Sequence, residues 1–387
     1  MKNTLKKSLS VFVAVVTVMM LFSVMAFAYD GIGTSTDYRY ESKYLAAKLF
    51  YNDFAVISDS HYAIPGLENT DVLGSDCSCM TPQGLCVSED FIFISAYCSV
   101  KKYKAELEEN FDFGGNADKL SAEGNHVTHN SVIYIIDRKS GEYVKNMVLP
   151  DTNHVGGLAF DGKNLLIAKS SDEQISVISS KQIERVLATK SRTVAVEYDY
   201  SVDCGCTASF VTYHDGIIWV GVFNENEEGE LNGFTFDAEA NELNSLVSVK
   251  IPAKANGACF AELEGEICLA VNSSYGRKNI SEISLYSVDN YGNEDMSINQ
   301  KDKYNAPPTV QNSCIYDGRV YYIYESAATC YSEVESLFDT KSTSCAIDRI
   351  CIGDADKLFN WHCQEDMLSV KIKAFFTAVS DLISSLF

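Results

Sequence analysis

Closely spaced cysteines are the first residues of this chain whose types suggest chemistry. Cys77-Ser78-Cys79 and Cys204-Gly205-Cys206 share one Cys-x-Cys pattern. Two such pairs supply enough thiolates for a zinc site, although structural zinc sites usually separate paired cysteines by about two to four residues. Disulfides that link the two loops and buried free thiols are the alternatives. We expect the disulfides and assign no metal.

Cys259 and Cys268 form a further candidate disulfide, because they flank an expected tight turn at Leu263-Glu264 symmetrically. Directly opposed residues of a hairpin bring their Cβ atoms close enough to bridge. The alternative is that both side chains are buried as small apolar groups. The chain has 13 cysteines, so at least one thiol stays free or pairs with another molecule.

His154 is the best catalytic candidate, since an imidazole titrates near neutral pH and serves as a general base or a metal ligand. The loop from Asp289 to Asp295 carries oxygen ligands suited to calcium but lacks the spacing of an EF-hand, so we expect a solvated turn. The chain contains no nucleophile elbow, zincin motif, P-loop or dinucleotide fingerprint. The sequence therefore names no cofactor and no established catalytic set.

A repeated hairpin signal indicates which elements position these residues. Each copy joins two apolar runs through an acidic turn, and the turns begin at Glu89, Asp161, Asp215, Glu264 and Asp317. Another alternating apolar segment follows each hairpin, so each unit of about 50 residues offers several short strands, as in a propeller blade. We predict an all-β protein with a β-propeller fold of five blades, with six blades as the alternative.

The repeat also divides the chain into regions. We expect an N-terminal segment whose residues 49–65 supply a strand that closes the ring, because closure removes exposed sheet edges. The charged, glycine-rich insertion 101–126 reads as a surface loop. Apolar residues at helical spacing predict a C-terminal amphipathic helix, which docks on the propeller or else on a membrane or partner. The predicted regions are 1–28 (signal peptide), 29–80 (N-terminal segment), 81–363 (propeller) and 364–387 (C-terminal helix).

The first 28 residues predict export. Lys2, Lys6 and Lys7 precede an apolar stretch that ends in Ala26-Phe27-Ala28, a small-residue cleavage site. The protein is therefore expected to be secreted, with an uncleaved membrane anchor as the alternative. The formal net charge of −22 argues against nucleic acid and against charge-driven binding to anionic membranes. Membrane contact is then expected only through the C-terminal helix or an uncleaved signal.

The starts of the innermost strands point to a ligand site. In a propeller these strands line the central channel, and a concave place with a few convergent polar groups is where a ligand is expected. The alternative is that the same groups hold ordered water. The side chains expected to converge are those of Gln83, His154, Cys206, Asn256, Gln311 and Asn312.

Short phrases in the first half of the chain carry a resemblance to known proteins. Pro82-Gln83-Gly84-Leu85, Ser140-Gly141 and His154-Val155-Gly156-Gly157-Leu158 are similar to phrases of uncharacterised secreted bacterial β-propeller proteins. More distantly they resemble plant-type glutaminyl cyclases, which are five-bladed propellers. The resemblance implies the same fold. It also implies a departure, because Gly156 stands where that family has the glutamate that assists the departing amine.

Two functions of different classes follow from these observations. The first is a secreted propeller that binds a peptide, a glycan or a protein at the channel mouth. The alternative is a propeller enzyme of glutaminyl-cyclase-like or lactonase-like type that uses His154, with or without a metal. A redox role of the Cys-x-Cys pairs ranks third. Titratable groups gathered in the channel would favour the enzyme, and a channel of amides would favour binding.

Overall fold

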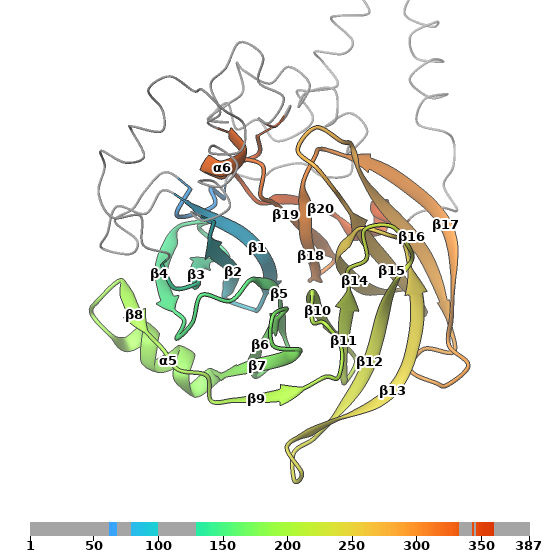
Figure 1. Cartoon of the computed structure of the whole chain (residues 1–387), viewed down its shortest axis with the longest axis horizontal. Helices are drawn as coiled ribbons and strands as arrows, with labels where there is room; N and C mark the ends of the chain where they lie inside the picture. The colour runs from blue at the N-terminus through green and yellow to red at the C-terminus, as the bar shows by residue number, and fades with distance from the viewer. Residues whose placement is uncertain (1–61, 68–78, 100–128, 333–342, 344–345, 360–387) are drawn as a thin grey trace, which may run out of the picture.

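The computed structural model describes residues 62–67, 79–99, 129–332, 343 and 346–359. Their strands form five sheets arranged around a common centre, as Figure 1 shows. The predicted five-bladed β-propeller is confirmed. The predicted signal peptide (1–28), insertion (101–126), C-terminal helix (364–387) and Cys77 lie outside the described residues. Within the described residues, no helix is long and apolar enough to cross a membrane.

Each blade is an antiparallel sheet whose first strand in sequence is the innermost one. The first blade contains β1 (Met80–Val87), β2 (Phe91–Cys98), β3 (Val132–Asp137) and β4 (Tyr143–Val148). The second contains β5 (Val155–Phe160), β6 (Asn164–Lys169), β7 (Gln174–Ser179) and β9 (Tyr200–Asp203). Between β7 and β9 the chain forms α5 (Ser180–Ala188) and β8 (Thr193–Ala195), and β8 pairs in parallel with β4 of the first blade.

The remaining blades follow the same order. The third contains β10 (Phe210–His214), β11 (Ile217–Val222), β12 (Gly229–Asp237) and β13 (Glu242–Ile251). The fourth contains β14 (Ala255–Leu263), β15 (Glu266–Ser273), β16 (Ser281–Asp289) and β17 (Ser297–Ala306). The fifth contains β18 (Val310–Tyr316), β19 (Arg319–Tyr324) and β20 (Cys351–Asp354), with the short helices α6 (Thr329–Ser332) and α7 (Ala355–Leu358).

The hairpin turns explain why the repeated signal encodes blades. In Asp215-Gly216, Glu264-Gly265 and Asp317-Gly318 both residues have positive φ, which is the conformation of a type I′ turn. The fourth-blade turn is therefore Glu264-Gly265, one residue later than expected. Cys259 consequently pairs with Ala270 and Cys268 with Ala261. The predicted opposition of Cys259 and Cys268 is wrong, and both thiols are free.

Residues near the N-terminus pair with the last blade. Ala63 forms an antiparallel bridge with Arg349, and the amide of Ile64 donates to the carbonyl of Asp348 at 2.9 Å. The Tyr62 hydroxyl also donates to the carbonyl of Arg138 in the first blade at 2.8 Å. The described part of the expected ring-closing segment thus contacts both the last and the first blade.

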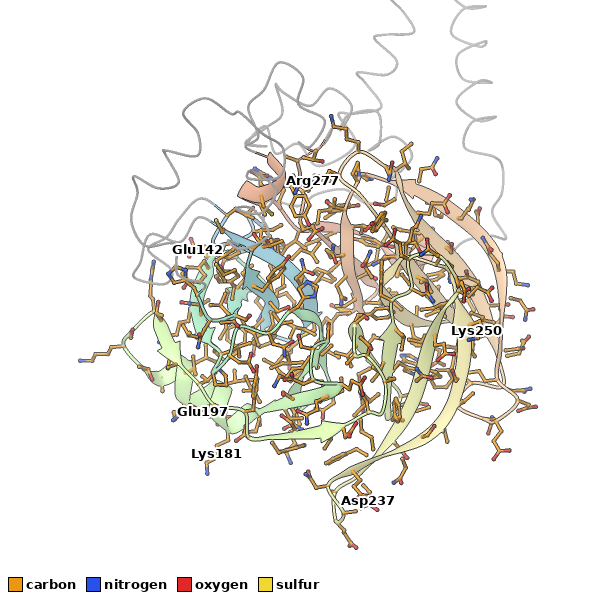
Figure 2. The ribbon with its side chains drawn as sticks, viewed as in Figure 1. Glu142, Lys181, Glu197, Asp237, Lys250 and Arg277 are labelled. Atoms are coloured by element: carbon orange, nitrogen blue, oxygen red, sulfur yellow. The ribbon has the colours of Figure 1, made fainter. Side chains whose placement is uncertain are left out.

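Apolar side chains fill the space between neighbouring blades, and the backbones approach closely near the axis. Leu85 and Ile94 of the first blade pack in one cluster with Tyr321 and Ile323 of the fifth. Charged side chains instead occupy the outer parts of the propeller, where Figure 2 labels Glu142, Lys181, Glu197, Asp237 and Lys250. A Cβ on Gly157 would lie 2.6 Å from the backbone nitrogen of Val211. Only glycine permits this approach of the second and third blades.

Candidate functional site

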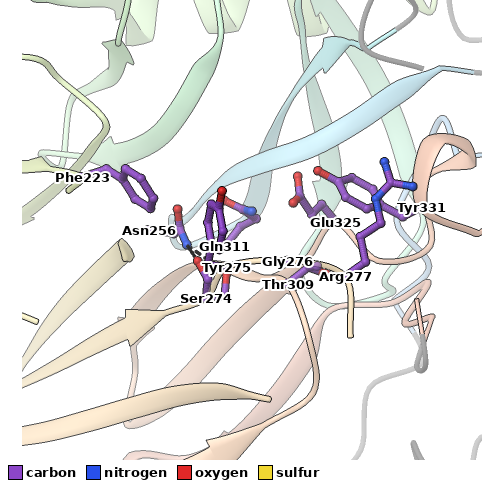
Figure 3. A pocket seen from close by; sticks show the side chains of 10 residues that line it. All are labelled: Phe223, Asn256, Ser274, Tyr275, Gly276, Arg277, Thr309, Gln311, Glu325 and Tyr331. Atoms are coloured by element: carbon purple, nitrogen blue, oxygen red, sulfur yellow. Dashed lines mark hydrogen bonds between the residues drawn. The ribbon is translucent and has the colours of Figure 1, made fainter. Parts of the chain in front are cut away.

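A pocket of about 340 Å³ lies where the third, fourth and fifth blades meet at one end of their innermost strands. Figure 3 shows its side chains converging from the ends of several strands and from α6. Aromatic rings, amides, hydroxyls, a guanidinium and a carboxylate all contribute to the wall. The lining residues are Phe223, Asn256, Ser274, Tyr275, Gly276, Arg277, Thr309, Gln311, Glu325 and Tyr331.

One position of the repeat supplies several of these groups. The residue directly after the second strand is Ser170, Phe223, Ser274 or Glu325 in the second to fifth blades. The Ser170 hydroxyl donates to the carbonyl of Ala208 at 3.0 Å, and the Ser274 hydroxyl donates to that of Val310 at 2.7 Å. Each serine therefore connects its blade to the next one. In the fifth blade a glutamate occupies this connecting position.

The Glu325 side chain joins the fifth blade to the first and faces the pocket. It is 8% exposed. Nε2 of Gln83 donates to Oε2 of Glu325 at 2.9 Å and also to the carbonyl of Pro82 at 2.8 Å. The Tyr331 hydroxyl is hydrogen-bonded to the same carboxylate. Burial raises the pKa of Tyr331 well above its usual value, so this hydroxyl keeps its proton.

The partners of the Glu325 carboxylate among the described residues are neutral. Within the described part of the chain, no lysine, arginine or histidine forms an ion pair with it. A carboxylate taken out of water loses solvation that neutral donors replace only in part. Glu325 thus contributes a negative charge to the pocket wall that no direct ion pair with a described residue neutralises.

Asn256 presents an acceptor to the same pocket. Its Nδ2 donates to the carbonyls of Lys254 and Ser274 at 3.1 Å and 2.8 Å and to the Ser274 hydroxyl at 2.9 Å. These acceptors fix the orientation of the amide. Its Oδ1 therefore points away from them, as Figure 3 shows, and is available to a ligand.

Thr309 and Gln311 add polar groups at the base of the fifth blade. Thr309 is 3% exposed, and its Oγ1 has no hydrogen-bond partner among the described residues. Gln311 is buried and lines the pocket beside it. A buried hydroxyl without a partner costs free energy until a ligand or water satisfies it.

Arg277 and two tyrosine rings belong to the pocket wall, and Lys254 lies beside one of these rings without lining the pocket. The guanidinium of Arg277 lies 4.6 Å from the centroid of the Tyr331 ring, and Nζ of Lys254 lies 5.4 Å from that of Tyr275. A hydrogen bond to Glu225 raises the pKa of Tyr275. Tyr275 is one of the exposed large apolar side chains, at 46%. The two basic groups thus stack on tyrosine rings at the rim.

Some of the residues predicted from the sequence come together here and others do not. Gln83, Asn256 and Gln311 meet at the pocket or at its acid, as described above. Asn312 is 1% exposed, and neither atom of its amide has a hydrogen-bond partner in the described structure. It does not line the pocket.

His154 and Cys206 also lie apart from the pocket wall. His154 is exposed and makes an edge-to-face contact with Tyr97, with ring centroids 4.5 Å apart. Cys206 lies in the loop after β9, where Nδ2 of Asn232 contacts its sulfur at 3.8 Å. The third innermost strand begins at Phe210, later than the expected start at Cys204–Thr207. This longer connection moves Cys206 away from the place assigned to it.

Cys204 and Cys206 interact with each other. The thiol of Cys204 contacts the carbonyls of Glu173 and Cys206 at 3.0 Å and 3.2 Å. A hydrogen bond from Cys206 lowers the pKa of Cys204, and the same contact raises that of Cys206. Neither forms a disulfide, and neither does Cys79, so the disulfides predicted for these three cysteines are not present. In the ranges that the structure describes, no group of three or more histidine, cysteine or acidic residues is arranged to hold a metal ion.

Comparisons with known proteins give distant structural matches. No family model and no curated protein matches it. Glutaminyl cyclase from Myxococcus xanthus is a distant structural match, with a TM-score of 0.39, 11% identity and coverage of 71% of this chain and 90% of that one.

Two further solved structures are similar at the same distant level. One is hydrazine synthase from Kuenenia stuttgartiensis (TM-score 0.36, 8% identity, 69% of this chain covered), of which the match spans only 60%. The other is a chain of a nidogen/laminin complex (TM-score 0.34, 11% identity, 64% of this chain and 73% of that one).

Gly156 has a structural reason to lack a side chain. A Cβ at this position would lie 2.0 Å from the carbonyl oxygen of Ser209 in the third blade. A glutamate cannot occupy that place without displacing backbone. Among the described residues, the acid that lines the pocket is Glu325, and it is buried. Its sequence signal was an acid directly after the apolar run Arg319–Tyr324, and nothing in the repeat pointed to Tyr331.

Proposed function

We propose that this protein is a binding propeller that takes a small ligand, or one group of a peptide, glycan or protein, into the pocket beside Glu325. The observation that carries the proposal is a concave wall that presents hydrogen-bond acceptors to one cavity. Asn256 and Glu325 line it with an amide oxygen and a carboxylate, and the buried Oγ1 of Thr309 in the same wall has no partner among the described residues. Such groups gain hydrogen bonds when a ligand enters, which gives binding its specificity.

The size and lining of the pocket support a small binding group. A cavity of about 340 Å³ lies at the lower end of the range of small-molecule sites. Phe223, Tyr275 and Tyr331 supply ring surface, which contributes binding energy through apolar contact. A larger partner would therefore insert one terminus, side chain or sugar unit, with the remainder lying outside.

We also propose that the protein is exported and acts outside the cytoplasm. It is supported by the charged, apolar and small-residue pattern of residues 1–28 and by the acidic composition, which suits an exported soluble protein. Expression in an exporting bacterial host with mass spectrometry of the recovered protein tests it. We expect a mature chain that begins at Tyr29, and recovery of the intact chain in the membrane fraction would contradict cleavage.

A propeller enzyme remains the second candidate, and the structure favours a different residue for it. Glu325 is a buried acid at a pocket wall and is hydrogen-bonded to Tyr331, whereas His154 is exposed and lies apart from the wall. A general acid or base must reach the reacting group within the site. Cyclase-like or lactonase-like turnover would thus depend on Glu325, and the His154→Ala variant would keep full activity.

Ligand screening tests the binding proposal directly. Peptides, amines, sugars and organic acids are screened by ligand-observed NMR and by thermal shift. For any ligand found, we expect Phe223→Ala to weaken binding by about 10-fold, as removal of a buried aromatic contact does. The matched control is Phe236→Ala, a 37% exposed ring on the β12–β13 hairpin. Absence of any ligand, or equal weakening by both variants, would contradict the proposal.

A further inference from the structure

The unneutralised charge of Glu325 restricts which ligand the pocket favours. Gln83 and Tyr331 hold the carboxylate in place as neutral donors. A second carboxylate or a phosphate near Glu325 would meet like-charge repulsion in a partly dehydrated site. A cation there recovers the electrostatic energy that burial of the acid has cost. The fixed carboxylate therefore selects for positive charge.

The neighbouring polar groups select for hydrogen-bond donors. The Nδ2 of Asn256 is committed to its acceptors on Lys254 and Ser274, so only Oδ1 remains for a ligand. Thr309 lines the same wall, and its buried Oγ1 has no hydrogen-bond partner among the described residues. A protonated amine carries three donors and no acceptor. A protonated amine therefore matches the acceptors of Glu325 and Asn256 better than a hydroxyl or another neutral group does.

The cations at the rim limit the total charge of the ligand. Lys254 and Arg277 stack over the rings of Tyr275 and Tyr331. Neither of them forms an ion pair with Glu325 in the described structure. Their positive charge at the rim disfavours a second cationic group on a ligand that extends outwards. The site thus fits one ammonium group followed by a neutral or negatively charged portion.

We infer that the ligand presents a single protonated amine to Glu325, with Oδ1 of Asn256 as a second acceptor. This inference rests on the proposed function, since it names the chemical class that the same pocket binds. A peptide N-terminus, a lysine side chain and a small free amine share this chemistry. The Glu325 carboxylate forms the ion pair, and Phe223 with Tyr275 contacts the apolar part that follows the amine.

Calorimetry and ligand-observed NMR on the full folded chain test the inference. The probes are Ala-Ala-Phe amide with a free N-terminus, its N-acetyl form, N-acetyl-lysine methylamide, butylamine, butanol and spermidine. We expect a free amine of at least one kind (peptide N-terminus, lysine side chain or small amine) to bind. Its N-acetyl or alcohol counterpart should bind about 10- to 100-fold more weakly, because a hydrogen bond to a charged group is lost. Spermidine is expected to bind more weakly than the preferred single amine.

A matched pair of variants separates the role of Glu325 from a general charge effect. Glu325→Gln keeps an acceptor for Gln83 and removes the charge, so we expect a 10- to 100-fold loss of amine affinity. Glu266→Gln removes an exposed acid at the opposite end of β15 and is expected to leave affinity unchanged. The comparison of free and acetylated probes on the unaltered protein needs no variant, so poor folding of Glu325→Gln would leave the inference testable.

The outcomes distinguish the inference from the proposed function. If neutral or acidic ligands bind in the pocket as tightly as their amine counterparts, or if Glu325→Gln leaves amine affinity unchanged, the inference is overturned while binding at this site stands. If no probe or library compound binds, both are overturned. If amines bind and acetylation abolishes binding, the preferred probe also identifies the source of the amine.

Discussion

Replacement of Gln83 by leucine is expected to destabilise the propeller at its ring closure. Gln83 is 1% exposed, and its amide donates to Glu325 across the junction of the first and fifth blades. Gln83→Leu keeps the side-chain volume similar and removes the donor. The carboxylate then keeps only the Tyr331 hydroxyl as a described partner. A hydrogen bond to a charged group contributes about 1.5–3 kcal/mol, and we expect a loss of about 2–3 kcal/mol.

The assay is equilibrium unfolding in urea at constant pH, in which a shift of the midpoint at unchanged slope reports stability. A double-mutant cycle with Glu325→Gln isolates the contact, and we expect a coupling free energy of at least about 1 kcal/mol. Gln300→Leu on the exposed face of β17 is the control and should change stability by less than about 0.5 kcal/mol. A coupling free energy near zero would refute the argument that this contact holds the ring closed.

Three further predictions concern single residues. Burial lowers the pKa of His214 despite the nearby acids Asp215 and Glu262. The unfolded chain therefore binds more protons than the folded one below about pH 6.5. The free energy of unfolding should then fall as the pH drops from about 7.5 to about 5.5. Thermal unfolding of the unaltered chain and of His214→Gln checks this, since the variant should show a smaller drop. Gly156→Glu should lower stability by at least about 2 kcal/mol because its Cβ overlaps Ser209, and recovery of a fully stable variant in urea unfolding would show that the backbone yields. The hydrogen bond from Cys206 lowers the pKa of Cys204. Alkylation followed by mass spectrometry should therefore detect the Cys204 thiolate at a lower pH in the unaltered chain than in Cys206→Ala. Identical pH profiles of the two proteins would exclude this hydrogen bond as the cause.

The architecture could be predicted from the sequence because each blade repeats one local rule. Two apolar runs around an acidic-glycine turn form a hairpin, and the turns at Asp215-Gly216 and Asp317-Gly318 have the conformation that this pattern predicts. Asn256 and Gln311, which stand near the starts of innermost strands, line the pocket, and their role in binding stays a prediction. The prediction of the fold succeeded because turn chemistry and strand alternation depend on neighbouring residues only.

The predictions that failed depend on register or on connections of unequal length. The fourth-blade turn has Gly265 at its second position, which shifts the register of the hairpin by one residue in the turn. Cys259 therefore pairs across the hairpin with Ala270 and not with Cys268. The connection from β9 to β10 is longer than expected and displaced Cys206. The starts of the first strands do not reveal Glu325, because it follows the end of the second strand of its blade. The pocket also takes residues that follow the ends of the second strands.

The fifth blade shows how a repeat acquires a site. Ser170 and Ser274 connect their blades to the next through a hydroxyl and a backbone carbonyl, a contact that needs only a short neutral side chain. At the junction where the last blade meets the first, Glu325 makes this connection to the side chain of Gln83 instead. The Glu325 side chain is longer than serine and charged, so its negative charge stays at the cavity wall after the hydrogen bond to Gln83 forms. The same residue therefore closes the ring and supplies the group that a cationic ligand would recognise, so the two roles are tied by one hydrogen bond.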